Sequence, residues 1–68
     1  MTLKDTLALV LSSDEAVSKS METYDSEGYI IIADKEEQQQ VLSKLEENDF
    51  YVYDEQFIDG VYRIYIEL

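Results

Sequence analysis

Hydrophobic positions in the first two dozen residues repeat with the period of a helix. One apolar stripe contains Leu3, Leu7, Val10, Val17, Met21 and Tyr24. Asp14 interrupts this stripe, and Ser12 with Glu15 three positions later forms a capping-box pattern. The pattern therefore predicts two helical pieces, at about 2–11 and 13–23, and leaves open whether they are collinear.

A strand and a third helix follow. Asp25–Gly28 has the composition of a turn, and Tyr29–Ala33 is apolar on both faces, which is typical of a well-covered strand. Asp34 and Glu37 then form a second capping box. The helix that it predicts covers about 35–48, and its thin apolar stripe contains Val41, Leu42 and Leu45.

The last third of the chain is rich in strand-forming residues. Apolar runs at Phe50–Tyr53, Phe57–Ile58 and Val61–Ile66 are separated by a polar interval and by Asp59-Gly60. An Asp-Gly pair between two such runs favours a type I′ turn, because both central residues of that turn need positive φ. The sequence therefore predicts a C-terminal β-hairpin.

Pairing Ile58 with Val61 divides the hairpin side chains between two faces. One face carries Tyr51, Tyr53, Glu55, Phe57, Tyr62, Ile64, Ile66 and Leu68. The other carries Phe50, Val52, Asp54, Ile58, Val61, Arg63, Tyr65 and Glu67. Glu55 opposite Ile64 conflicts with an apolar row, so we expect a bulge or a longer loop around Asp54–Gln56.

The element order predicts an α+β fold within one small acidic domain, residues 1–68. An N-terminal helix, broken near Ser12, precedes a β-α-β-β unit. We expect a small three-stranded mixed sheet that ends in the hairpin, with the helices packed on one face. The strand order stays open, and one arrangement places the C-terminal strand between the other two.

The net charge of the chain limits the kinds of partner that it can bind. Sixteen acidic and five basic residues give a formal net charge of −11. Nucleic acid and anionic membranes would be repelled by such a chain, whereas a basic protein would be attracted at long range. No secretory signal is visible, and both longest apolar runs are too short to span a bilayer. We therefore expect a cytoplasmic protein.

The composition also argues against an enzyme. His and Cys are both absent, and the two glycines are too far apart to form a phosphate-binding loop. Acidic residues in the turns do not have the spacing of a calcium loop, so we interpret them as solvated side chains. We expect no catalytic residues, no metal site and no cofactor.

The six tyrosines and two phenylalanines indicate more about function than the acidic residues in the turns do. Tyr53 and Tyr62 are expected to pack under the helices. If all helices cover one side of the sheet, the second face of the hairpin is an exposed apolar patch ringed by acids. Tyrosine is enriched at protein interfaces, so such a patch indicates a binding partner.

In size and composition the whole chain resembles the small acidic proteins that phages and mobile elements direct against host nucleic-acid machinery, including anti-restriction DNA mimics and anti-CRISPR inhibitors. The resemblance implies a stoichiometric inhibitor in the host cytoplasm, whose carboxylates occupy a surface that normally binds phosphates. The alternative is a small regulatory or structural module, homodimeric or not, whose acidity serves solubility.

The sequence places the expected partner-binding surface on the hairpin, where acids and aromatic residues coincide. Asp54, Glu55 and Asp59 are the acids that we expect to face a basic partner, a nucleic-acid-binding protein. Phe50 and Tyr65 are the expected aromatic anchors beside them.

Overall fold

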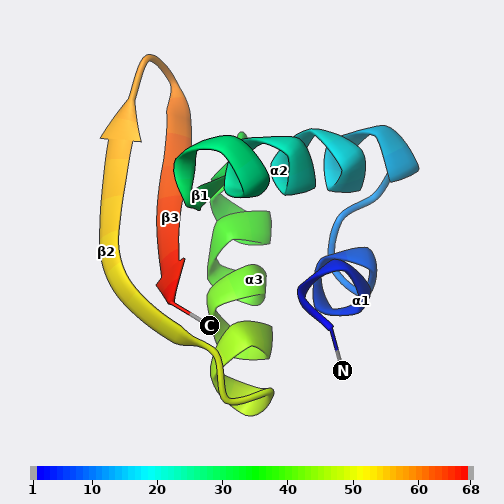
Figure 1. Cartoon of the computed structure of the whole chain (residues 1–68). Coiled ribbons are helices and arrows are strands. Elements are labelled where there is room, and N and C mark those ends of the chain that lie inside the picture. Colours follow the sequence, from blue (N-terminus) through cyan, green and yellow to red (C-terminus); the bar gives the residue numbers. More distant parts are fainter. Residues whose placement is uncertain (1, 68) are drawn as a thin grey trace.

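Across residues 2–67, which the computed structural model describes, helices pack on one side of a sheet (Figure 1). The elements in chain order are α1 (Leu3–Ala8), α2 (Asp14–Glu27), β1 (Tyr29–Ile32), α3 (Lys35–Glu47), β2 (Tyr51–Ile58) and β3 (Val61–Glu67). The predicted α+β class and element order are confirmed.

The predicted break in the N-terminal helix is confirmed, and Figure 1 shows α1 and α2 pointing in different directions. Ser13, not Ser12, caps α2, because its Oγ accepts a hydrogen bond from the backbone N–H of Ala16 at 3.1 Å. α2 also continues through the expected turn to Glu27. It ends at Gly28, whose φ of 86° is readily adopted only by glycine.

The sheet has the strand order β1-β3-β2, and β3 is antiparallel to both neighbours. β1 and β2 therefore run in the same direction, with α3 as the crossover between them. The expected mixed sheet is instead antiparallel throughout, because the C-terminal strand takes the central position that the sequence left open. Asp59 and Gly60 have φ values of 53° and 82°, which confirms the predicted turn.

One bulge decides which hairpin side chains face the helices. The register shifts between Val52 and Asp54, so Tyr53 is the extra residue. The bulge lies one residue before the expected interval, and β2 continues unbroken through Asp54–Gln56. The predicted pairing holds from Ile58 to Asp54, whereas beyond the bulge the two faces are exchanged.

The hydrophobic core lies between the helices and the helix-facing side of the sheet. Its buried members are Leu3, Leu7, Leu11, Val17, Ile30, Ile32, Val41, Leu45, Ile64 and Ile66. Ser20 of α2 adds a polar connection, since its hydroxyl donates to the carbonyl of Ile31 at 2.8 Å. β1 is an edge strand, so this bond supplies a donor to an edge that would otherwise be open.

Candidate protein-binding surfaces

The end of α3 determines where the chain enters β2. Asp49 adopts a left-handed φ of 63°, and the N–H of Phe50 donates to the carbonyl of Leu45 at 2.9 Å. The N–H of Asp49 donates to the carbonyl of Glu46 at 3.2 Å. This pair of bonds is a Schellman motif, in which the residue after the left-handed position packs back on the helix. Phe50 is accordingly half-buried against the core.

Beside this motif lies a shallow groove of about 360 Å³ between α3 and β2. Its lining residues are Leu42, Glu46, Phe50, Tyr51, Val52 and Glu55. Apolar side chains from the helix, the loop and the strand form most of this lining, and two carboxylates stand among them. We call this feature the acidic groove.

Two positions along α3 relate differently to β2 beside the acidic groove. Near its N-terminus, Gln38 is only 8% exposed, and its Nε2 donates to Oε1 of Glu55 at 3.0 Å. This bond gives the Glu55 carboxylate a partner on the helix-facing side of the strand, opposite Ile64. Farther along α3, Leu42 is only half-buried, so apolar surface stays open to solvent.

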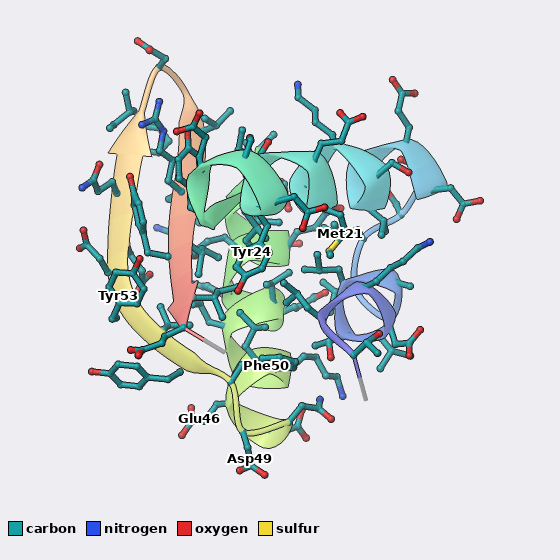
Figure 2. The ribbon with its side chains drawn as sticks, viewed as in Figure 1. Met21, Tyr24, Glu46, Asp49, Phe50 and Tyr53 are labelled. Atoms are coloured by element: carbon teal, nitrogen blue, oxygen red, sulfur yellow. The ribbon has the colours of Figure 1, made fainter. Side chains whose placement is uncertain are left out.

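Three acidic residues, Glu46, Glu47 and Asp49, follow one another closely where α3 ends. Figure 2 shows Glu46 and Asp49 pointing outward where α3 connects to β2. The ion pair between Lys44 and Glu47, at 3.3 Å, is the one salt bridge that the structure shows for residues 2–67. Glu46 and Glu55 therefore remain available to a cationic group that enters the groove.

Within residues 2–67, no helix covers the opposite side of the sheet (Figure 1). We call it the open sheet face, and alternation along the paired strands assigns to it Tyr29, Ile31, Tyr51, Asp54, Gln56, Ile58, Val61, Arg63, Tyr65 and Glu67. At its centre the ring of Tyr65 lies 5.0 Å from the ring of Tyr29 and 6.0 Å from that of Tyr53. These centroid distances are those of packed aromatic pairs.

Arg63 is the only basic residue in the three strands. Its Cζ lies 4.9 Å from the centroid of the Tyr29 ring, within the range of a cation–π contact. Its Nε is buried and has no hydrogen-bond acceptor within residues 2–67. A positive group with one unsatisfied donor therefore lies on a face of an otherwise acidic protein.

No known protein family, curated protein or solved structure matches this chain. Within residues 2–67 no three acidic side chains come together as a metal-binding group. The same part of the chain contains no helix with the length and apolarity to cross a bilayer. The acidic groove, the open sheet face and the net charge are therefore the features that bear on function.

The structure separates the five residues that the sequence grouped into one binding surface. Glu55 and Phe50 line the acidic groove, whereas Asp54 and Tyr65 pair on the open sheet face. Asp59 lies at the tip of the hairpin. Asp54 and Glu55 are residues of the continuous strand β2, so the longer loop that was one expectation for this interval is wrong.

Several expected positions of aromatic side chains are also corrected. Tyr53 was expected under the helices, but it is the bulged residue, is 53% exposed, and its ring contacts that of Tyr65. Phe50 and Val52 were expected on the uncovered face, but both pack against the core. Tyr62 packs there as predicted.

Sequence reasoning missed residues that complete both surfaces. Glu46 is not among the predicted partner-binding residues, although four positions earlier Leu42 marks the same helical side. Gln38 continues the buried positions Val41 and Leu45 by one turn, and this period was the available signal. Nothing in the sequence indicates that Arg63 lies over Tyr29, because this contact joins two strands.

Proposed function

We propose that this protein is a non-enzymatic interaction protein that binds the basic, nucleic-acid-binding surface of another protein and blocks it stoichiometrically. The observation that carries the proposal is the acidic groove, in which Glu46 and Glu55 stand beside the apolar surface of Leu42, Phe50 and Val52. Nucleic-acid-binding surfaces present Lys and Arg with interspersed apolar or aromatic side chains. The groove has the complementary chemistry.

The net charge of −11 supports the same proposal. A protein this acidic accelerates its encounter with a basic partner and repels other acidic proteins. The groove adds what charge alone lacks, namely a place for an apolar anchor between two carboxylates. Its small size fits one side chain with its flanking charges, so the rest of the affinity has to come from the surrounding acidic surface.

The resemblance to phage and mobile-element inhibitors belongs to this proposal. An inhibitor of that kind acts in the host cytoplasm on a defence or nucleic-acid-processing protein. A second candidate function is a small regulatory or structural module that acts as a homodimer. The open sheet face, with its ring cluster around Tyr65, favours that second candidate.

A defined probe tests the groove. We would titrate the isotope-labelled protein with a short peptide in which one Phe is flanked by Arg and Lys, and follow the backbone amide signals by NMR. The largest shifts are expected at Leu42, Phe50 and Val52, and they should shrink when salt rises from about 0.05 M to 0.5 M. A control peptide with Ser in place of Phe should bind more weakly.

Two double variants with the same change in net charge distinguish binding at the groove from attraction by the net charge of the whole protein. Glu46→Gln combined with Glu55→Gln should weaken peptide binding about tenfold, since both carboxylates beside the apolar surface are lost. Glu22→Gln combined with Glu27→Gln, two exposed positions of α2, changes the net charge equally and should have a smaller effect. Equal losses in both double variants would show that the groove is not the binding site.

A further inference from the structure

The open sheet face has the character of an interface. Its apolar side chains come from every strand, and the half-buried rings of Tyr29 and Tyr65 pack on each other instead of under a helix. Tyr53 extends this cluster toward the edge of β2. Contiguous uncovered surface of this kind, rich in aromatic side chains and edged by polar ones, marks protein contact sites.

The positive charge of Arg63 favours some binding partners of the open sheet face over others. Its guanidinium group lies 4.9 Å from the centroid of the Tyr29 ring and has no ion-pair partner within residues 2–67. A basic partner would add a like charge over this position. An occupant that supplies a carboxylate would instead form an ion pair with the guanidinium group. The open sheet face therefore fits a different kind of partner from the acidic groove.

A second copy of the chain offers this chemistry. Asp54 and Glu67 lie on the same open sheet face as Arg63, beside the same tyrosines. In a two-fold dimer each contact occurs twice, so the Arg63 of each copy meets a carboxylate of the other. We propose that the protein forms a homodimer in which the two open sheet faces pack against each other, with Arg63 bonded across the interface.

The distribution of acids makes this packing compatible with the net charge. Ten of the sixteen acidic residues lie in the helices, on the side of the sheet away from the interface. Packed sheets are about 10 Å apart, so the helices of the two copies would form the outer layers of the dimer. The like charges on α1, α2 and α3 are thereby held apart, and salt screens the rest.

Edge-to-edge association of the sheets is the competing geometry. β2 is a free edge strand, but the bulge at Tyr53 interrupts its ladder and Asp54 and Glu55 follow directly. Bulges and charged side chains are the features that protect edges from pairing with another chain. Face-to-face packing buries the tyrosine cluster, whereas Leu42, Glu46 and Glu55 of the acidic groove lie on the helix-bearing side of the sheet. It does not depend on the ligand of that groove.

Sedimentation equilibrium and native mass spectrometry of the whole chain test the proposal. The expected species has twice the 7.9 kDa mass of one chain, and its population should rise with salt, because screening weakens the repulsion between copies. A single-chain mass up to about 1 mM, in low and high salt, would overturn the proposal.

Two variants of equal charge locate the interface. Tyr53→Glu changes a residue that is 53% exposed beside the open sheet face, and Leu9→Glu changes one that is 60% exposed at the end of α1. Tyr53→Glu should give a monomer and Leu9→Glu should stay dimeric, with circular dichroism confirming that both are folded. The reverse outcome, or a dimer in both, would place the interface elsewhere.

Arg63→Gln tests the proposed hydrogen bond across the interface. The variant should raise the dimer dissociation constant about tenfold or more, because the charge-assisted bond to the carboxylate is lost. An unchanged dissociation constant in a folded Arg63→Gln protein would contradict the assigned role of this side chain.

Discussion

Gln38 of α3 donates a hydrogen bond from Nε2 to Oε1 of Glu55 in β2, at 3.0 Å. This bond explains why a carboxylate is tolerated on the side of the sheet that faces the helices. Gln38 is buried, so loss of the acceptor would leave its amide without a partner, while Glu55 retains access to solvent. Glu55 also lines the acidic groove, together with Leu42, which follows Gln38 by about one turn of α3.

Replacement of Gln38 by Leu tests this connection. We expect Gln38→Leu to lower the free energy of unfolding by about 1 kcal/mol, because the added apolar burial only partly offsets the lost bond to Glu55. Gln40→Leu, the same change at an exposed position of α3, is the control and should have little effect. Urea unfolding curves measure both, and equal stabilities would mean that the bond contributes nothing.

The left-handed conformation of Asp49 predicts a stabilising substitution. Asp49→Gly should raise the free energy of unfolding by about 0.5–1 kcal/mol, because glycine adopts the φ of 63° without steric cost. Asp49→Asn removes the same negative charge from the end of α3 but keeps a β-carbon. A melting temperature that rises equally in both variants would assign the gain to charge instead of backbone conformation.

The hairpin turn predicts the opposite response at Gly60. A β-carbon there would meet no atom within 4 Å, so any cost of substitution comes from the φ of 82°. Gly60→Val should therefore destabilise the protein by roughly 1–2 kcal/mol. Thermal unfolding provides the measurement, and a melting point like that of the unchanged protein would be incompatible with the type I′ turn.

Ionisation of the Tyr24 hydroxyl makes the free energy of unfolding depend on pH in the alkaline range. Burial raises the pKa of its hydroxyl, and the charges of Tyr53 and Asp25 raise this pKa further. A folded pKa above the unfolded value of about 10 means that the neutral hydroxyl stabilises the fold. This stabilisation is complete below about pH 10 and is lost as the pH rises through the folded pKa.

Tyr24→Phe should consequently show a smaller fall in stability above about pH 10 than the unchanged protein. Tyr51→Phe, at a residue that is 63% exposed, should keep the original pH dependence. Urea unfolding at a series of alkaline pH values distinguishes them. Identical slopes for all three proteins would argue against a role for Tyr24.

Much of the fold follows from short-range signals in the sequence. Asp34 caps α3 as predicted, with its Oδ2 accepting from the N–H of Glu37 at 3.0 Å, and Asp59-Gly60 forms the expected turn. Both signals depend on a few neighbouring residues whose conformational preferences are strong. For this reason the strand pairing predicted from the Asp59-Gly60 turn agrees with the structure from Ile58 back to Asp54.

The position of the bulge at Tyr53 could not be predicted from the sequence. Tyr51 and Val52 are both suited to an apolar face, so hydrophobicity does not indicate which of them turns inward. The structure turns Val52 inward and exposes Tyr51. This single extra residue moves Phe50 to the helix-facing side that Glu55 occupies and separates it from Asp54 and Tyr65 on the open sheet face.

The proposed function requires that this protein compete with nucleic acid for a basic surface. The most direct measurement uses the protein that the chain captures from lysate of its source cell at low salt, together with that protein's labelled nucleic acid, and follows fluorescence anisotropy during addition of the acidic chain. We predict that the nucleic acid is released at one equivalent, and that the Glu46→Gln, Glu55→Gln double variant needs about tenfold more. Nucleic acid that stays bound while the acidic chain saturates the captured protein would contradict the claim.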